Sequence, residues 1–422
     1  MPRRLALSLL IAWLAWISPV SAQGPQPQGP PGPGYYGMAP GGPYTAGGEA
    51  GEYQLQPSFY EQLHPETRSA YDEYEPAINL GLSETFHRTW FRTDYLWMNY
   101  RPPGSRFIGA VPLTIPPATF DPRALFPAFD RVLGVRVGLE GRLVSLESSD
   151  YRDNHGLRMT MGVPTELFTW EASGFAMGEA DSNLQFNNFL DVNSPFGETV
   201  IAAIPLTRNG LPAFRNYLLF DQGMNVNVRS NLQGVDTRFV FGAITPNVAT
   251  EVAPLIGFNY LHYSNELSIR GDDSGTATSH RIDSRANNNI FGPEIGLRME
   301  TRSKWMTLGF EPKFTFGINR MSNHVATQQI FSPLEADREV KDALTRFSPV
   351  IELETYARFR LAENLMFSIG YQFMATTNVS MADQNIVWDS SSILIDPPRI
   401  GLVQNRDDFW MQGINVGLQW QF

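Results

Sequence analysis

The sequence predicts an all-β fold: a transmembrane, antiparallel, up-and-down outer-membrane β-barrel of about 12 strands, preceded by a disordered N-terminal arm. Three observations predict this fold class. The chain opens with a secretory signal, most of the remainder alternates apolar and polar residues, and the closing stretch, WMQGINVGLQWQF, keeps that alternation to its final aromatic residue except at Met411 and Gln412. A strand with one large apolar face suits a barrel, because lipid covers that face and neighbouring strands cover both edges.

Residues 1–22 have the pattern of a signal peptide. Arg3 and Arg4 form a positive segment, residues 5–17 an apolar core, and residues 20–22 a small-residue cleavage site. The apolar run is shorter than the roughly 20 residues that a spanning helix needs. We therefore expect export followed by cleavage, and residence in the bacterial outer membrane through strands.

Residues 23–85 form the expected arm. The first part, beginning QGPQPQGPPGPGYYG, is rich in Pro, Gly and Tyr and cannot assemble a core. Residues 52–85 are acidic and aromatic without clean periodicity, so they could plug a pore, bind the cell wall or hang free. The barrel is expected to occupy residues 86–422.

The composition excludes several classes of site. The chain has no cysteine, which excludes disulfides, thiolate metal ligands and cysteine nucleophiles. Its formal net charge is −11, and loss of the two signal arginines would make it more negative, which argues against a nucleic-acid partner. No motif indicates a cofactor or a metal site.

Period-two alternation recurs along the predicted barrel. In VLGVRVGLEGRLV, for example, Leu133, Val135 and Val137 share one face, while Arg136 and Glu140 share the other. Such segments predict strands near residues 86–100, 105–114, 131–147, 155–163, 167–178, 214–243, 251–270, 276–302, 304–321, 345–361, 365–380 and 406–422. Residues 214–243 are long enough to be a broken pair instead. Long outer loops and short inner turns mostly alternate between the segments, as they do in outer-membrane barrels.

Barrel size decides which face points outward. A barrel of about 12 strands with an apolar interior would enclose a wide hole that water does not fill cheaply, so the apolar face is expected to meet lipid. The charged face then lines the lumen. Its expected residues are Arg92, Asp94, Arg136, Glu140, Arg142, Arg158, Glu294, Arg298, Glu300, Glu311, Lys313, Glu352, Glu354, Arg358 and Arg360.

Trp420 and Phe422 end the last predicted strand. We expect them to serve as a C-terminal signal for the machinery that assembles outer-membrane barrels. Outer-membrane lipid and that machinery are therefore expected partners, and the oligomeric state stays undetermined.

Several stretches together resemble the seventh beta-barrel porin family of bacterial outer-membrane proteins. They are WFRTDYLWMNY (90–100), TWEASGF (169–175), IGFNYLHYSNELSI (256–269), NNIFGPEIGLR (288–298), IGYQFMATTNVSMADQNI (369–386) and FWMQGINVGLQWQF (409–422). The resemblance implies an outer-membrane barrel of porin type without a defined catalytic constellation. Two positions depart from the family pattern, because Asn259 and Ser380 stand where arginine and a basic residue are usual.

The leading functional expectation is passive diffusion of small polar solutes through a wet lumen. Its rival is a lumen closed by opposite charges that brace each other. Acidic residues outnumber basic ones in the expected outer loops, which predicts a weak cation preference. These acidic residues are Asp272, Asp273, Glu335, Asp337, Glu339, Asp383, Asp389, Asp407 and Asp408.

Two other functions remain as alternatives. A non-conducting barrel could anchor the N-terminal arm to the cell wall or surface. An outer-membrane hydrolase could use Asp272, Asp273, His280 and Asp283, with His155 beside Asp153 on another loop. Nearness in sequence supplies no acid–base geometry, so we expect no enzymatic activity. The transported solute is not encoded in any recognisable motif.

Overall fold

The structure is a computed structural model that describes residues 88–101, 106–110, 125–130, 134–149, 151–191, 199–245, 250–390, 399–403 and 405–422. The expectations for residues 1–22 and 23–85 lie outside these ranges. Within the described ranges, no helix has the length and apolar character to cross a membrane.

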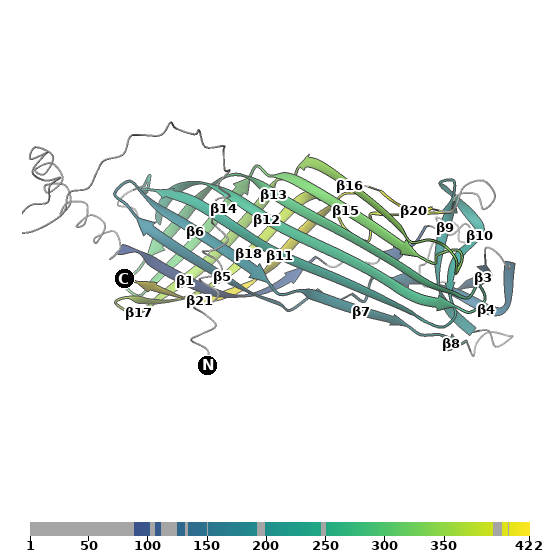
Figure 1. Cartoon of the computed structure of the whole chain (residues 1–422). Helices are drawn as coiled ribbons and strands as arrows, with labels where there is room; N and C mark the ends of the chain where they lie inside the picture. Colours follow the sequence, from purple (N-terminus) through teal and green to yellow (C-terminus); the bar gives the residue numbers. More distant parts are fainter. Residues whose placement is uncertain are drawn as a thin grey trace, which may run out of the picture. The chain divides into compact units, whose positions relative to one another are not determined.

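Ten strands close into an antiparallel ring (Figure 1). In ring order they are β12 (Thr250–Asp273), β11 (Met224–Phe241), β6 (Phe168–Met177), β5 (Asn154–Pro164), β1 (Trp90–Tyr100), β21 (Asp407–Gln421), β18 (Leu365–Val379), β17 (Val350–Ala362), β14 (Met306–Thr315) and β13 (Thr278–Arg302). The β12–β13 pairing closes the circle, and β1 pairs with β21 along the whole length of β1. The predicted outer-membrane barrel fold is confirmed, with two strands fewer in the ring than the expected 12 or so.

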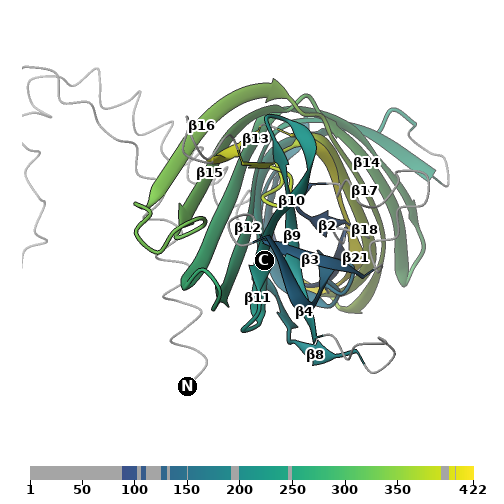
Figure 2. The same ribbon diagram turned by 90° about the vertical axis from the view of Figure 1, so that its right-hand side faces the viewer.

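The two missing wall strands belong to a second sheet. This sheet crosses one end of the barrel (Figure 2). It contains β2 (Phe107–Ile108), β3 (Phe126–Asp130), β4 (Gly134–Ser145), β8 (Phe189–Leu190), β9 (Thr199–Arg208), β10 (Leu211–Phe220), β19 (Ile386–Asp389) and β20 (Arg399–Leu402). The predictions that 105–114 and 131–147 are wall strands are therefore wrong. Alternation reports one apolar face, and that face can meet either lipid or a protein core.

The segment 214–243 forms two strands, which is the alternative that its length left open. Its first part is β10, in the second sheet, and its second part is β11, in the wall. Because β10 leaves the ring, the wall keeps an even number of strands.

Three more strands lengthen one side of the wall beyond the ring. They are β7 (Ala180–Phe186), β15 (Ile318–Gln328) and β16 (Arg338–Phe347). β15 continues the line of β14 along β13, and β16 continues the line of β17. At the first break the Ser348 amide donates to the Gly317 carbonyl at 2.8 Å, and a side chain at Gly317 would collide with the Ser348 backbone. Glycine is required there by this close approach.

The side-chain pattern of the wall reverses along the strands. In the lower part of β12 and β13, Ile256 and Ile295 point outward and are each 48% exposed, whereas Asn259 and Glu294 point inward and are buried. Beyond Tyr260 and Phe291 the inward residues are mostly apolar, with Asn265 and Asn288 among the exceptions, and the outward ones are polar. The spanning half thus suits lipid outside and polar groups inside, and the outer half suits water outside and a core inside.

That core joins the outer wall to the second sheet. Inward residues of the wall, such as Leu267 and Ile282, pack in one cluster with Val144, Ile204 and Phe220 of the second sheet. All five are at most 1% exposed. The outer end of the barrel is therefore filled with apolar side chains.

The reversal predicts different tolerances at two positions on the same face of β12. Ile256→Arg would place a charge in lipid and should destabilise the folded barrel by about 2–4 kcal/mol. Ser264→Arg, beyond the reversal, should cost no more than about 1 kcal/mol for its lost hydrogen bond to Asn287. Urea titration of both variants in lipid vesicles measures the difference. Equal losses would place the lipid boundary elsewhere.

Candidate functional site

Fourteen charged side chains of the described residues lie in the interior of the spanning half and make up the lumen network. They are Arg92, Asp94, Arg158, Glu171, Asp236, Arg238, Glu294, Arg298, Glu300, Glu311, Lys313, Glu352, Glu354 and Arg358. Each reaches the interior because it occupies an inward position of a wall strand, opposite the lipid-facing apolar residues. Eight are carboxylates and six are cationic, so the formal balance is two negative charges.

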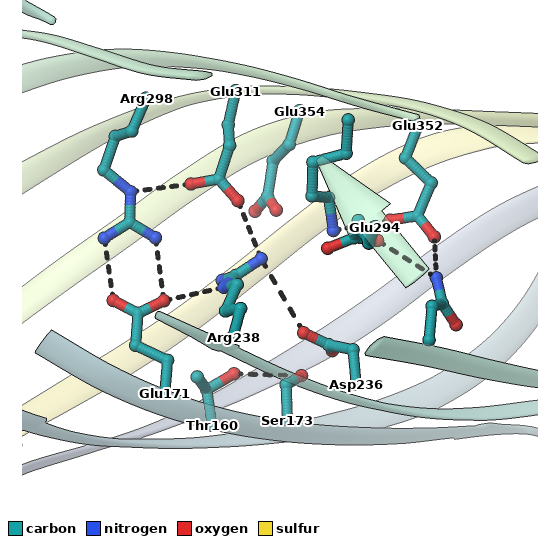
Figure 3. A network of polar contacts seen from close by, with 12 residues as sticks. Thr160, Glu171, Ser173, Asp236, Arg238, Glu294, Arg298, Glu311, Glu352 and Glu354 are labelled. Carbon is teal, nitrogen blue, oxygen red and sulfur yellow. Dashed lines mark hydrogen bonds and ion pairs between the residues drawn. The ribbon is translucent and has the colours of Figure 1, made fainter. Parts of the chain in front are cut away.

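Two arginines and two glutamates form a closed ring of ion pairs (Figure 3). Arg298 donates to Glu171 through both terminal nitrogens at 2.7 and 2.8 Å, and through Nε to Glu311 at 2.7 Å. Arg238 contacts the same two carboxylates at 2.8 and 2.7 Å. These residues come from β6, β11, β13 and β14, so the ring ties strands across the lumen. Paired guanidinium and carboxylate groups of this geometry are the strong charge-assisted kind.

A second group ties the opposite side of the wall. Arg158 on β5 contacts Asp94 on β1 at 2.9 Å and Glu354 on β17 at 2.7 Å. Asn415 on β21 donates to Glu354 at 3.0 Å. Arg92 lies 3.0 Å from Asp94. The group therefore bridges the closing seam of the barrel.

A third group has fewer cations than carboxylates. Lys313 lies 2.6 Å from Glu352, and Asn259 donates to Glu352 at 3.0 Å and to Glu294 at 3.3 Å. Thr315 donates to Glu294 at 3.3 Å. One lysine thus serves two carboxylates, and an amide stands between them. This group supplies one of the two excess negative charges of the network, and Asp236, which lies 3.8 Å from Arg238, supplies the other.

At the lower end of the lumen, Tyr356 donates to Glu300 at 2.6 Å and Arg358 contacts the same carboxylate at 3.3 Å. The Tyr356 ring lies over Gly309 of the neighbouring strand, where a Cβ would collide with the ring. A vestibule of about 310 Å³ opens here, lined in part by Glu300 and Arg358. Further up, the space between the three groups shrinks to about 20 Å³.

A strap, residues 380–385, crosses the interior above the network. Its backbone bonds to wall side chains: the Ser380 amide donates to Asn288 at 2.8 Å and the Ala382 amide to Asn265 at 2.9 Å. The Ser380 hydroxyl donates to Asn323 at 2.7 Å. Ser380, Ala382 and Asn385 are fully buried. The wall amides therefore satisfy the backbone of a segment that has no strand partner there.

Arg106 and Arg101 fasten the strap to the start of β21. Arg106 contacts Asp383 at 3.2 Å and also pairs with Asp407, which Arg101 reaches at 3.2 Å. Burial raises the pKa of the Asp383 carboxyl, and the positive charge of Arg106 opposes that rise. Two of the expected mouth carboxylates, Asp383 and Asp407, are thus engaged in holding the loop.

The structure brings eleven of the fifteen expected lumen residues together in the lumen network. Arg136, Glu140 and Arg142 lie instead on β4, in the second sheet, so their expected place in the wall is wrong. Arg142 donates to the Asn187 carbonyl and lies over Phe186 and Phe189. Arg360 is on β17 but exposed at its end.

Sequence reasoning missed Glu171, Asp236 and Arg238. Glu171 stands alone among apolar and small residues in FTWEASGFAM, and the other two lie in the segment whose division was unresolved. Each of the three residues occupies an inward-facing position of its strand. The alternation of the sequence shows this once the strand boundaries are known. Trp420 faces outward on β21, and the Phe422 amide donates to the Thr89 carbonyl at 3.1 Å beside the seam.

The candidate hydrolase residues are held in other contacts. The two ring nitrogens of His280 contact the Thr278 hydroxyl and the Gln329 carbonyl, and Asp272 accepts from Ser279 at 2.6 Å. His155 bonds to the Tyr95 hydroxyl at 2.7 Å, while Asp153 accepts from the Trp97 indole at 2.8 Å. Tyr95 and Trp97, the partners of His155 and Asp153, lie on the lipid-facing side of β1.

The ring of ion pairs predicts a large cost for removing one carboxylate. Glu171→Gln leaves Arg238 and Arg298 to share Glu311, with Asp236 at 3.8 Å from Arg238 alone, and the barrel should lose about 3–5 kcal/mol of folding free energy. Glu251→Gln, at the exposed rim, should change it by less than about 1 kcal/mol. Denaturant titration of both variants in detergent micelles compares them. Similar small losses would mean that Glu171 is not a structural tie.

The chain was compared with solved structures and with protein families. Three solved structures are similar in part. The outer membrane protease OmpT of Escherichia coli has a TM-score of 0.42 and 10% identity over 80% of this chain and 98% of that one. The toluene transporter TodX of Pseudomonas putida has 0.26 and 9%, over 79% and 90%. A FadL homologue of Pseudomonas aeruginosa has 0.21 and 8%, over 79% and 90%.

No curated protein sequence matches the chain. A family model described as "Putative beta barrel porin-7 (BBP7)" matches residues 137–422, which is more than half of the chain. The resemblance seen in the sequence motifs is thereby confirmed, as is residence in the bacterial outer membrane. This protein belongs to the beta barrel porin-7 family of outer-membrane barrels.

Proposed function

We propose that this protein passes small polar solutes across the outer membrane, and that the arrangement described above is its closed state. The observation that carries the proposal is the lumen network, which lines the spanning half of the barrel with charged groups. A wall that only needed stability could pack apolar side chains there, since buried ion pairs rarely stabilise more than such packing. Charged linings suit hydrated solutes.

Two barriers would have to move for passage. The first is the network itself, which leaves about 20 Å³ between its groups. The second is the strap with the apolar core above it. The ion pairs and the amide contacts of the strap are polar, so water can replace them at lower cost than it can replace apolar packing. The apolar core above the strap would have to move aside as well.

We also propose a weak cation preference, now placed in the lumen as well as at the mouth. The network carries two more carboxylates than cations. Asn259, which stands where the family pattern has arginine, lies between Glu294 and Glu352. The missing positive charge at that point supports a local excess of cations.

The alternative is a braced, non-conducting barrel that anchors the arm of residues 23–85. The narrowness of the space inside the network favours it, because barrels with few strands fill their interiors with side chains. We propose no enzymatic activity for either version. Each version would have outer-membrane lipid as its surroundings.

Conductance separates the two functions. In planar bilayers the mature protein should show rare, small openings, and Glu171→Gln combined with Glu311→Gln should make them at least about tenfold more frequent by breaking the ring of ion pairs. A Ser380→Cys, Asn323→Cys pair should close the channel on oxidation and reopen it on reduction. The natural chain has no cysteine, so no other disulfide interferes. Silence of all these variants, also without residues 23–85, would favour the anchor.

Selectivity tests the charge argument. Reversal potentials in a salt gradient should show a modest cation preference for the natural chain. Asn259→Arg should weaken or invert it, because the new cation compensates Glu294 and Glu352. Asn287→Arg, at an outward position of β13, serves as the control. Anion preference of the natural chain would contradict the proposal.

We further propose that Trp420 and Phe422 are read by the barrel-assembly machinery. Deletion of Phe422 should lower the amount of folded protein in the outer membrane several-fold, while refolding of the purified chain in detergent should proceed as before. Heat-modifiable migration in gels measures folded protein in both cases. An unchanged level in cells would contradict this role.

A further inference from the structure

The outer half of the wall carries an arginine-rich hollow on its outward face. The hollow has a volume of about 550 Å³ and is lined by residues of β11, β12, β13 and β15. Its charged members include Arg229, Arg270, Arg281 and Arg285, against the carboxylates Glu266 and Asp283. In a chain with a formal net charge of −11, this local excess of positive charge is unusual.

Strand register forces two of these arginines together. Arg270 on β12 lies directly opposite Arg281 on β13. Side chains at opposite positions are neighbours, and like charges there destabilise a sheet. Arg281 is partly neutralised by Asp283 at 2.6 Å, but Arg270 has no ion-pair partner among the described residues. An anion bridging the two guanidinium groups would remove the repulsion.

The remaining arginines are already tied, which limits where an anion fits. Arg285 pairs with Glu266, and Arg229 lies 3.3 Å from Glu179 at the edge of the hollow. Arg270 and Arg281 are therefore the arginines that can take an anion, although Asp272, two residues beyond Arg270, is a nearby carboxylate that accepts from Ser279. Asn225 lies opposite Arg270, and Gln328 lies opposite Arg281 with its amide donated to Asp337 at 2.7 Å. Guanidinium forks with amides beside them are the groups that recognise phosphate.

The height of the hollow indicates what can reach it. It lies on the same outward face as Tyr260 and Phe291, the last lipid-facing residues before the reversal. Arg270 is ten residues beyond Tyr260, which for a tilted strand corresponds to about 25 Å above the hydrocarbon. The phosphate of a phospholipid lies within about 8 Å of the hydrocarbon. A phosphate carried on a longer sugar head group can reach the hollow.

We propose that the hollow at Arg270 and Arg281 binds phosphate groups on the sugar chain of an outer-leaflet glycolipid. Each guanidinium donates two parallel N–H bonds to phosphate oxygens, and the two positive charges face one dianion. The bound sugar chain then lies against the outer wall. This goes beyond the proposed function, because the hollow is outside the lumen and binding needs no conduction.

Binding to a phosphorylated glycolipid tests the proposal. The probe is purified rough lipopolysaccharide with a phosphorylated inner core, added to the full mature protein in detergent at fixed salt. We expect saturable binding, and we expect Arg270→Gln combined with Arg281→Gln to weaken it at least tenfold. Enzymatic removal of the core phosphates should weaken binding by a similar factor. Native mass spectrometry or thermophoresis gives the readout.

Two controls keep the result specific. Arg320→Gln removes an outward arginine that lies just above the lipid boundary and outside the hollow, and it should bind as the natural chain does. Gel migration before and after heating shows that each variant is folded. Equal binding by the double variant, or by the dephosphorylated probe, would overturn the proposal. Inorganic pyrophosphate that binds as tightly as the glycolipid would overturn the assignment to a lipid.

Discussion

The structure depends on one constraint: the same wall must face lipid along half of its height and water along the other half. In β12 and β13 the side-chain pattern reverses at Tyr260 and Phe291. Below this level the backbone needs a closed ring, since lipid offers no hydrogen-bond partner, and the inward residues are free to be polar. Above it the inward residues become a core, and a core needs something to pack against. The second sheet supplies that partner.

The constraint also explains which parts of the fold could be predicted from sequence. The strands at 155–163, 251–270 and 406–422 were predictable because a strand that is apolar on one face is recognised by alternation alone. The segment at 131–147 has the same alternation but packs on the apolar core. Periodicity identifies an amphipathic strand, not the medium that covers it, so the count of wall strands was too high.

In the lumen, too, some features could be predicted from sequence and others could not. Glu294, Arg298 and Glu311 were predictable, because charge at alternate positions of a lipid-facing strand leaves only the interior for them. Their contacts were not predictable: the ring with Glu171 and Arg238 joins strands that are far apart in sequence, and it depends on the register of four pairings. The strap at residues 380–385 could not be foreseen either, since its amide partners are spread over β12, β13 and β15.

The long β12–β13 hairpin has a consequence for the order of assembly. Its two strands pair without interruption from Asp273 opposite Thr278, 5 residues apart, to Thr250 opposite Thr301, 51 residues apart. The seam between β1 and β21 joins opposite ends of the barrel sequence. Local pairings form with little loss of chain entropy, whereas the seam must await nearly the whole chain. Chain entropy therefore favours early pairing of the hairpin and late closure of the seam.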